Sequence, residues 1–462
     1  MIRPHAYPNW LPKRFPIIAL RFTLAAWSCL LMLMAWQASA LGQTVIPSES
    51  VDAHLGVASC GGSTCHGAVK PAQGSRVLQD EFLVWRRQDK HARAYEVLLE
   101  PRAQKIASNL GLPDAHTAKV CLDCHADNVA AGSRGRQFQI ADGVGCEACH
   151  GGAQRWLGTH IAGTSTTADL YKLGLFPTSD PVMRSQLCLS CHLGDESRFA
   201  SHRLMGAGHP RLSFELNTFS KIQPAHYRVD DDYARRKTVA TALQTWAIGQ
   251  AMAVSRLMEM IENPKRRSSG LFPELSFYDC HACHHPQTDL RWQPRAGTGL
   301  GPGVLRFNDA NLVMLRLIAR QTSGSADSKL GNLMLQLHRA MSEGQGDASQ
   351  IAREIKAVAD GLAKRLANHN FQTEDLRALV AALASDGASG ELSGYAAAEQ
   401  ATMALAAIVE ASKQGRLISD DRLKEVAEAL DDCYSATKNA DTFDPTRFDK
   451  AVQKVEAAFA KR

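Results

Sequence analysis

Five short cysteine–histidine motifs restrict the fold of this chain more than any other feature. Four of them read Cys-x-x-Cys-His and occupy residues 121–125, 146–150, 188–192 and 280–284. The fifth is wider, with four residues between Cys60 and Cys65, and ends in His66. Ten of the twelve cysteines in the sequence lie in these motifs.

Cys-x-x-Cys-His is the attachment signature of c-type haem. Two thiols add to the vinyl groups of one porphyrin, and the next residue, a histidine, becomes the proximal ligand of the iron. The wider first motif still ends in Cys-His, so we predict five covalently bound c-type haems. Zinc or disulfides are the alternatives for the four regular motifs, and a Cys60–Cys65 disulfide is the alternative for the first. The predicted anchors are Cys60, Cys65, Cys121, Cys124, Cys146, Cys149, Cys188, Cys191, Cys280 and Cys283, and the predicted proximal ligands are His66, His125, His150, His192 and His284.

The N-terminus reads as a secretory signal peptide. Residues 1–21 carry four basic residues and no acid, an apolar run covers residues 22–36, and Ala38-Ser39-Ala40 follows. This is the pattern of a cleaved leader, and we expect cleavage after Ala40. The alternative is a membrane anchor, but a spanning helix needs about 20 apolar residues, and the run at residues 22–36 is shorter. We therefore expect a periplasmic protein, without a membrane span once the leader is cleaved, in agreement with haem attachment outside the cytoplasm.

The charge balance gives no reason to expect nucleic acid as a partner. The full sequence has 52 Lys and Arg against 47 Asp and Glu, but the predicted leader removes four of the basic residues. Each ferric haem adds about one negative charge through its two propionates. The mature holoprotein is therefore expected to be mildly acidic.

We predict a mainly α fold with two domains after the signal peptide at 1–40. Residues 41–302 should form a loop-rich cytochrome domain whose core is built around the haems. The Gly-rich stretch 296–303 reads as a linker, and residues 303–462, rich in Ala, Leu and charged residues, should form a helical bundle. One long packing helix is expected between the last two motifs, from its apolar spacing at Leu243, Trp246, Gln250, Val254, Leu257 and Ile261.

Within the tail, apolar stripes at helical spacing predict individual helices. Asp444-Pro445 is a good helix start. Cys433 continues one stripe, so we expect a buried apolar residue, with a reactive thiol as the alternative. The three stripes are Ile351, Ile355, Val358, Leu362 and Leu366; Leu423, Val426, Leu430 and Cys433; and Phe448, Val452, Val455 and Phe459.

Distal ligands are harder to assign than proximal ones. His281 lies inside a motif, and His338 and His369 lie beyond the linker, so none of these three is expected to bind iron. Met205 is a rival sixth ligand. Eight histidines remain for five distal positions: His54, His91, His116, His160, His202, His209, His226 and His285.

Residues 60–192 resemble the cytochrome c-554 family. The first motif is followed by Trp85 and His91-Ala-Arg-Ala, and then by Cys-Leu-Asp-Cys-His-Ala-Asp at residues 121–127. The most specific part is Gly-Val-Gly-Cys-Glu-Ala-Cys-His-Gly-Gly at residues 143–152, with His160 downstream and Cys-Leu-Ser-Cys-His-Leu at residues 188–193. The family's type member is a tetrahaem electron carrier, and related haem packing occurs in hydroxylamine oxidoreductase.

The resemblance implies roles for particular residues. His91 would be the distal ligand of the Cys146/Cys149 haem, and His160 that of the first haem. The haem on His125 would lack a sixth ligand from the protein. The wider first motif, the Cys280 motif and the tail depart from the family pattern, so it does not assign the haems on His192 and His284. For those two we rank His209 first, then His202 and His226.

Two functions follow as expectations. The first is a periplasmic electron carrier with mostly bis-histidine haems that serves redox partner proteins. The second is an oxidoreductase that acts on a small nitrogen or sulfur species at an open haem on His125. The carrier ranks first, because no catalytic signature beyond haem is visible and there is no Cys-x-x-Cys-Lys motif. A high-spin haem that binds and turns over nitric oxide, nitrite or hydroxylamine would favour the enzyme.

Overall fold

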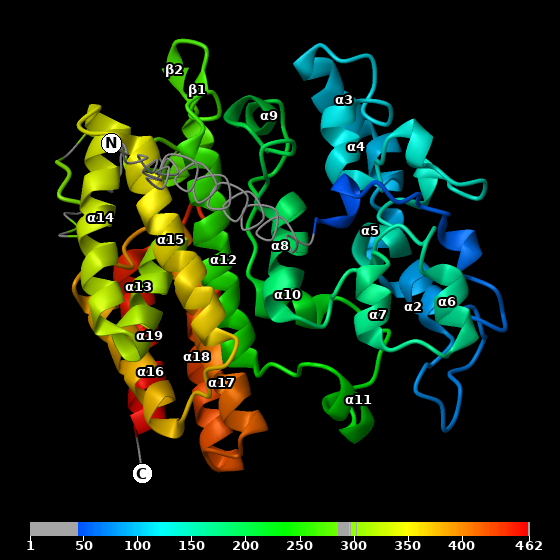
Figure 1. Cartoon of the computed structure of the whole chain (residues 1–462). Coiled ribbons are helices and arrows are strands. Elements are labelled where there is room, and N and C mark those ends of the chain that lie inside the picture. Colours follow the sequence, from blue (N-terminus) through cyan, green and yellow to red (C-terminus); the bar gives the residue numbers. More distant parts are fainter. Residues whose placement is uncertain (1–44, 285–294, 296, 302, 461–462) are drawn as a thin grey trace, which may run out of the picture. The chain divides into compact units, whose positions relative to one another are not determined.

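Helices and loops make up nearly all of the structure, which confirms the predicted mainly α fold. The computed structural model describes residues 45–284, 295, 297–301 and 303–460 (Figure 1). The predicted signal peptide and His285 lie outside these residues. The chain divides into Met1–Val45, of which only Val45 is described, and Ile46–Arg462, which contains every element below. The described residues contain one sheet, a hairpin of β1 (Ser268–Ser269) and β2 (Phe272–Pro273).

The first half of this unit consists of short helices joined by loops. Three small groups of buried apolar residues lie here, the largest of them Leu98, Ala107, Ala115, Leu122 and Ala126, while Leu189 joins a larger core described below. So few apolar contacts agree with the expectation that haem supplies much of the core here. The elements are η1 (Pro47–Glu49), η2 (Val57–Ser59), α2 (Glu81–Gln88), η3 (Lys90–Arg93), η4 (Glu96–Leu99), α3 (Pro101–Leu110), α4 (Lys119–His125), η5 (Ala131–Ser133), η6 (Ile140–Asp142), α5 (Cys146–His150), α6 (Leu157–Ala162), α7 (Thr167–Lys172), α8 (Pro181–His192), α9 (His202–Gly206), α10 (Leu216–Ile222) and α11 (Asp231–Arg236).

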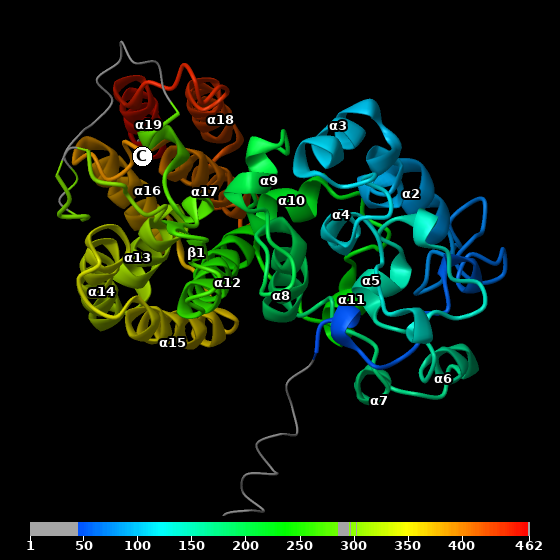
Figure 2. The ribbon, with the colours of Figure 1, turned by 90° about the horizontal axis from the view of Figure 1, so that it is seen from above.

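Helix α12 (Ala242–Glu262) is the long helix expected between the last two motifs. Thr241 caps its first turn, and Asn263 ends it before Pro264. The helix is buried on nearly every side, because α8, α10, α13, α15 and α17 all pack against it (Figure 2). It is therefore the central packing helix of the region.

The tail forms the predicted helices, and their apolar stripes point inward. Pro445 begins the last helix, as expected. Cys433 is fully buried, and burial raises its pKa to about 12, which agrees with an inert apolar role. The helical elements after α12 are η7 (Leu275–Phe277) and η8 (Cys280–Ala282), which precede the tail, and, within the tail, α13 (Ala310–Thr322), α14 (Gly324–Glu343), α15 (Ala348–Leu366), α16 (Thr373–Ala388), α17 (Tyr395–Gln414), α18 (Asp420–Ala436) and α19 (Pro445–Ala460).

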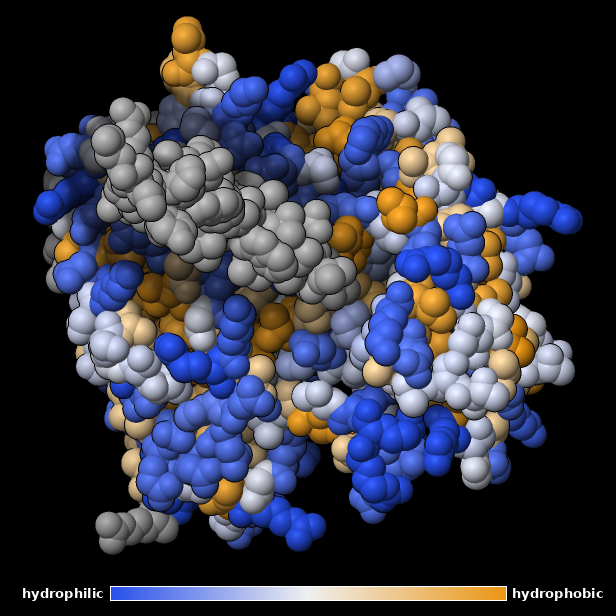
Figure 3. All heavy atoms as spheres, viewed as in Figure 1, coloured by the Kyte–Doolittle hydropathy of each residue, from blue (hydrophilic) through white to orange (hydrophobic). Residues whose placement is uncertain are grey.

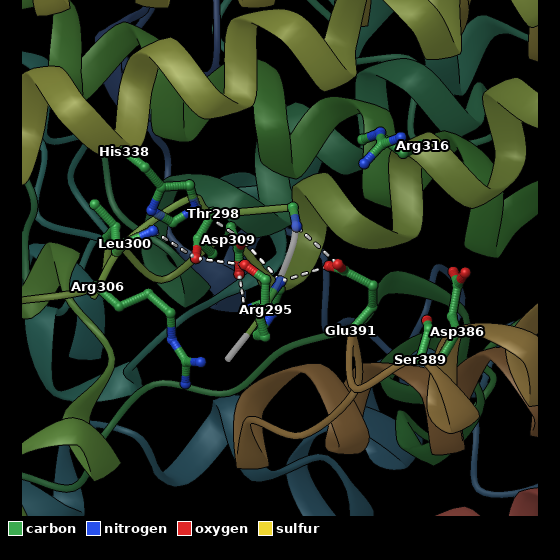
Figure 4. A network of polar contacts seen from close by, with 12 residues as sticks. Arg295, Thr298, Leu300, Arg306, Asp309, Arg316, His338, Asp386, Ser389 and Glu391 are labelled. Carbon is green, nitrogen blue, oxygen red and sulfur yellow. Dashed lines mark hydrogen bonds and ion pairs between the residues drawn. The ribbon is translucent and has the colours of Figure 1, made fainter. Parts of the chain in front are cut away.

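One apolar core runs across the predicted domain boundary near residue 302. It contains Leu189 of α8 and most of α12 together with α13–α19. The predicted linker also packs against the tail. Thr298 is buried, and the neighbouring Arg295 binds Asp309 and Glu391 (Figure 4).

The hairpin carries two exposed large apolar side chains next to each other. Leu271 is fully exposed and Phe272 is 73% exposed. They form the orange tip in Figure 3, at the place where Figure 1 draws β1 and β2. Within the described residues, none of the helices combines the length and apolar character required to cross a bilayer.

Candidate functional site

Each cysteine–histidine motif lies at a helical turn, and we number the sites 1 to 5 in chain order. Sites 2, 3 and 4 are carried by α4, α5 and the end of α8, and site 5 begins in η8. In a helix, residues three and four apart share a face, so both thiols and the histidine of a regular motif point to one side. Site 1 follows η2 in a wider turn, in which the amide of His66 donates to the carbonyl of Cys60.

Every motif histidine faces one further histidine, and the five partners are all different. The ring centres of His66 and His160 are 6.0 Å apart and nearly parallel, with 10° between the rings. The other four pairs are His125–His209 at 6.4 Å, His150–His226 at 6.1 Å, His192–His91 at 6.1 Å and His284–His202 at 6.3 Å.

These separations fit one iron between two imidazoles. A histidine nitrogen binds a metal at about 2.0 Å, and the nitrogen lies about 1.1 Å from its ring centre, so two opposite ligands have centres about 6.2 Å apart. Direct aromatic contact also reaches this range. Ordinary aromatic packing, however, would not explain why each of the five motif histidines meets its own separate histidine.

The motif cysteines form no disulfide in the part of the chain that the structure describes. All ten motif cysteines, including Cys60 and Cys65, are free thiols. Across the described ranges, no group of three or more Cys, His, Asp or Glu side chains is arranged to hold a metal ion. The arrangement that does recur is two thiols and two opposed imidazoles.

The structure brings together some of the expected pairs and not others. His160 faces His66, the pair that the family resemblance implies. His91 faces His192 and not the expected His150, whose partner is His226. His209, ranked first for His192 and His284, faces His125.

Consequently His125, which the resemblance left without a partner, has one in this structure. His202 faces His284. Of the other candidates, His54 and His116 contact Asp127 and Asp114 and face no motif histidine. Met205, the rival ligand, lies in the same short helix as His202, which occupies the position opposite His284.

Burial keeps several of these imidazoles neutral. It lowers the pKa of His150 and of His192 to about 4, and it also lowers the pKa values of His160, His209 and His226. A neutral imidazole is the form that binds a metal. At neutral pH these side chains are therefore ready to act as ligands.

The outward ring nitrogens have specific partners. Nδ1 of His66 donates to Glu81 at 3.0 Å, and Nδ1 of His91 donates to Asp89 at 2.9 Å. These hydrogen bonds raise the pKa values of both histidines. At site 2, His125 and His209 instead donate to the backbone carbonyls of Ala94 and Pro210, at 3.0 and 2.8 Å. Sequence reasoning missed both carboxylates, although the spacing Asp89-Lys-His91 allows such a contact.

Thiols of different motifs also meet. Cys60 of site 1 and Cys146 of site 3 lie close enough for each thiol to shift the pKa of the other, and so do Cys124 of site 2 and Cys191 of site 4. Sites 1 and 3 are therefore neighbours, and so are sites 2 and 4. The segments of sites 2 and 3, expected to be adjacent from their spacing, meet where the amide of Asp127 donates to the carbonyl of Gly143.

The segment around site 3, which is the most specific part of the family resemblance, is held in place by its own glutamate and glycines. The buried carboxylate of Glu147 accepts from the amides of Leu55, Gly56 and Ala153 at 2.6–2.8 Å. Gly151 has φ +86°, and a Cβ there would lie 2.4 Å from the carbonyl oxygen of Gly174. Only glycine fits this close approach.

The tail contributes side chains next to sites 4 and 5. The Tyr395 ring of α17 lies 4.9 Å from the ring of His281, between the two cysteines of motif 5. Glu399, also of α17, binds Arg211 at 2.9 Å. Glu399 and Arg211 line a cavity of about 70 Å³, and His192 of site 4 lines the same cavity. No sequence pattern predicted these contacts, because they join segments 114 and 188 residues apart.

Residues 59–151 match the family model described as cytochrome c554 and c-prime, which covers motifs 1 to 3. No curated protein and no solved structure matches the chain. The matched segment thus confirms the resemblance stated from the motifs. Together with the further motifs, it identifies a multihaem c-type cytochrome.

Proposed function

We propose that this protein is a periplasmic electron carrier with five bis-histidine c-type haems. The observation that carries the proposal is that all five motif histidines face a second histidine at 6.0–6.4 Å. Haem bound between such pairs supplies one-electron chemistry at low potential.

The chain's own residues support a relay. The motif cysteines would anchor each group, and the two histidines of each pair would both hold its iron and leave no place there for a substrate. The thiol contacts between motifs 1 and 3 and between motifs 2 and 4 favour short distances between those sites. No general acid or base is required. The alternative, an oxidoreductase acting at His125, loses support because His209 lies opposite that histidine.

The test is the spin state of the haem irons in the purified holoprotein. We expect five haems per chain by pyridine haemochrome assay, all low-spin by optical and EPR spectra, with no spectral change on adding nitric oxide, nitrite or hydroxylamine. H209A should open one position and make about one haem in five high-spin, because it removes one of the five facing imidazoles. H116A, which changes a histidine that faces no motif histidine, should leave the spectra unchanged. A high-spin haem in the unaltered protein would contradict the proposal.

A further inference from the structure

Two carboxylates distinguish sites 1 and 4 from their neighbours. Glu81 Oε2 lies 3.0 Å from Nδ1 of His66, and Asp89 Oδ1 lies 2.9 Å from Nδ1 of His91. Asp89 is 5% exposed and is held by two further donors, the amide of His91 and Nε2 of Gln223, each at 3.0 Å. Glu81 is held by the amide of Leu78 at 3.0 Å. Both carboxylates are therefore fixed against their histidines.

The neighbouring sites have backbone partners instead. Both histidines of site 2 donate to carbonyls, and His226 of site 3 bonds to the carbonyl of Pro224. Among the residues that the structure describes, no carboxylate forms a hydrogen bond with a paired histidine of sites 2 or 3; the charges of Glu81 and Asp89 reach His226 of site 3 without a hydrogen bond and partly oppose the lowering of its pKa by burial. Since motif 1 adjoins motif 3 and motif 4 adjoins motif 2, each adjacent couple has one member backed by a carboxylate.

A carboxylate behind a ligating imidazole changes the electron affinity of the metal. It draws the Nδ1 proton toward itself, raises the basicity of the ligating nitrogen and so favours the more positive oxidation state. The ferric form gains more than the ferrous form, and the reduction potential falls. Because Asp89 is nearly buried, its charge is less screened than a surface charge would be.

We propose that Glu81 and Asp89 are positioning residues that set the reduction potentials of sites 1 and 4 below those of sites 3 and 2. The inference rests on the five-haem function proposed above. An electron shared within either couple is then held mainly at site 3 or site 2. Sites 1 and 4 act as the strongly reducing members.

The test is a potentiometric titration of holoprotein carrying E81Q or D89N, followed in the optical spectrum. Each change keeps the size and a hydrogen-bond acceptor and removes the charge. We expect one of the five components to become at least tenfold easier to reduce in each variant, an upward shift of about 59 mV or more for a one-electron couple. E81Q and D89N should move different components, and the double variant should move both. E81D and D89E, which restore a charge, should return the potentials toward their original values.

Asp114 provides a matched control. Asp114-Ala-His116 repeats the spacing of Asp89-Lys-His91, and Asp114 contacts Nδ1 of His116 at 3.2 Å, but His116 faces no motif histidine. D114N should leave every potential unchanged.

The outcomes separate this inference from the proposed function. Haem content or spin state different from five low-spin haems in the unaltered protein would remove the proposed function. Five low-spin haems whose potentials stay in place or fall in E81Q and D89N would overturn the inference alone, as would an equal upward shift in D114N. The two sites are tested separately, so a loss of folding in one variant leaves the other to decide.

Discussion

At the scale of single residues, a buried polar cluster outside the haem sites joins Arg295, just before the linker, to the tail. Arg295 and Asp309, with side chains 2% and 4% exposed, form a two-pronged ion pair at 2.9 and 3.0 Å. His338 and Glu391 add contacts at 3.0 and 3.2 Å (Figure 4). Removing one partner of such a pair leaves a buried charge without compensation.

We therefore expect D309N to lower the free energy of unfolding by about 3–5 kcal/mol. The pKa of Asp309 is held well below its usual value in the folded state: burial opposes this, and Arg295 and His338 outweigh it. The stability that the Asp309 carboxylate contributes is present above the unfolded pKa of about 4 and is lost as pH falls further.

Guanidinium unfolding followed by circular dichroism measures both the loss in D309N and its pH dependence. D432N, which breaks the exposed Lys454–Asp432 pair, should cost under about 0.5 kcal/mol; equal losses in the two variants would contradict the argument.

Asp449 should show the opposite pH dependence. Burial, and then the charge of Asp444, raise its pKa to about 6, and its Oδ1 atom has no hydrogen-bond partner. A raised acid pKa stabilises the fold below the unfolded pKa of about 4, and this contribution disappears as pH rises through about 6. D449N should therefore gain about 1 kcal/mol at pH 7 and nothing at pH 4. Unfolding curves at the two pH values measure the difference, and an equal gain at both would refute it.

The histidines illustrate what local sequence can and cannot predict. Cysteine and proximal histidine are tied by a fixed spacing of one helical turn, so the motifs identified both. The facing histidines come from short helices and loops that are distant in the sequence: His91 faces a residue 101 positions later, and His209 faces one 84 positions earlier. Only the packing of those segments decides which histidine meets which motif. The family pattern paired His160 with His66, as found, but gave a different arrangement for His91 and His125.

At the scale of elements, helix α17 connects the tail to site 5 through Tyr395. This side chain is 7% exposed, its ring lies against His281, and its hydroxyl donates to the carbonyl of Thr437 at 3.0 Å. We expect Y395A to cost about 3–5 kcal/mol, as for other buried aromatic truncations, and to alter the low-spin EPR signal of one haem. Y434A on α18, where the side chain is 44% exposed, is the control that should change neither. An unchanged EPR spectrum in Y395A would contradict the prediction that α17 influences the haem of site 5.

Helix α12 shows why an apolar stripe underestimates burial. The predicted stripe marked one face, yet the small residues between its members are buried as well, including Ala247, Gly249 and Ala251. A Cβ on Gly249 would lie 2.7 Å from Cβ of Leu216, so the absence of a side chain lets α10 approach. The stripe could predict the helix but not how many neighbours cover it, because alanine and glycine carry no strong pattern of their own.

At the scale of the whole molecule, the shared core decides whether the chain can be divided near residue 302. The predicted boundary separates α12 from α13, α15 and α17, which pack against it and share its apolar core. A chain that ends at residue 302 would expose Trp246, Ile248 and Met258, all fully buried in the intact protein. Exposing such side chains costs about 1.5–3 kcal/mol each, and together they approach the whole stability of a typical domain.

We therefore expect the shortened chain to aggregate or to lack a cooperative thermal transition. Size-exclusion chromatography and circular dichroism melting measure this. The matched control is the full chain cleaved only in the exposed loop at residues 344–346, which keeps every contact of α12. That nicked protein should stay associated and melt cooperatively, because packing and not chain connection holds the tail in place. A shortened chain that is monomeric, melts cooperatively and keeps its haems would instead show that two independent domains meet near residue 302.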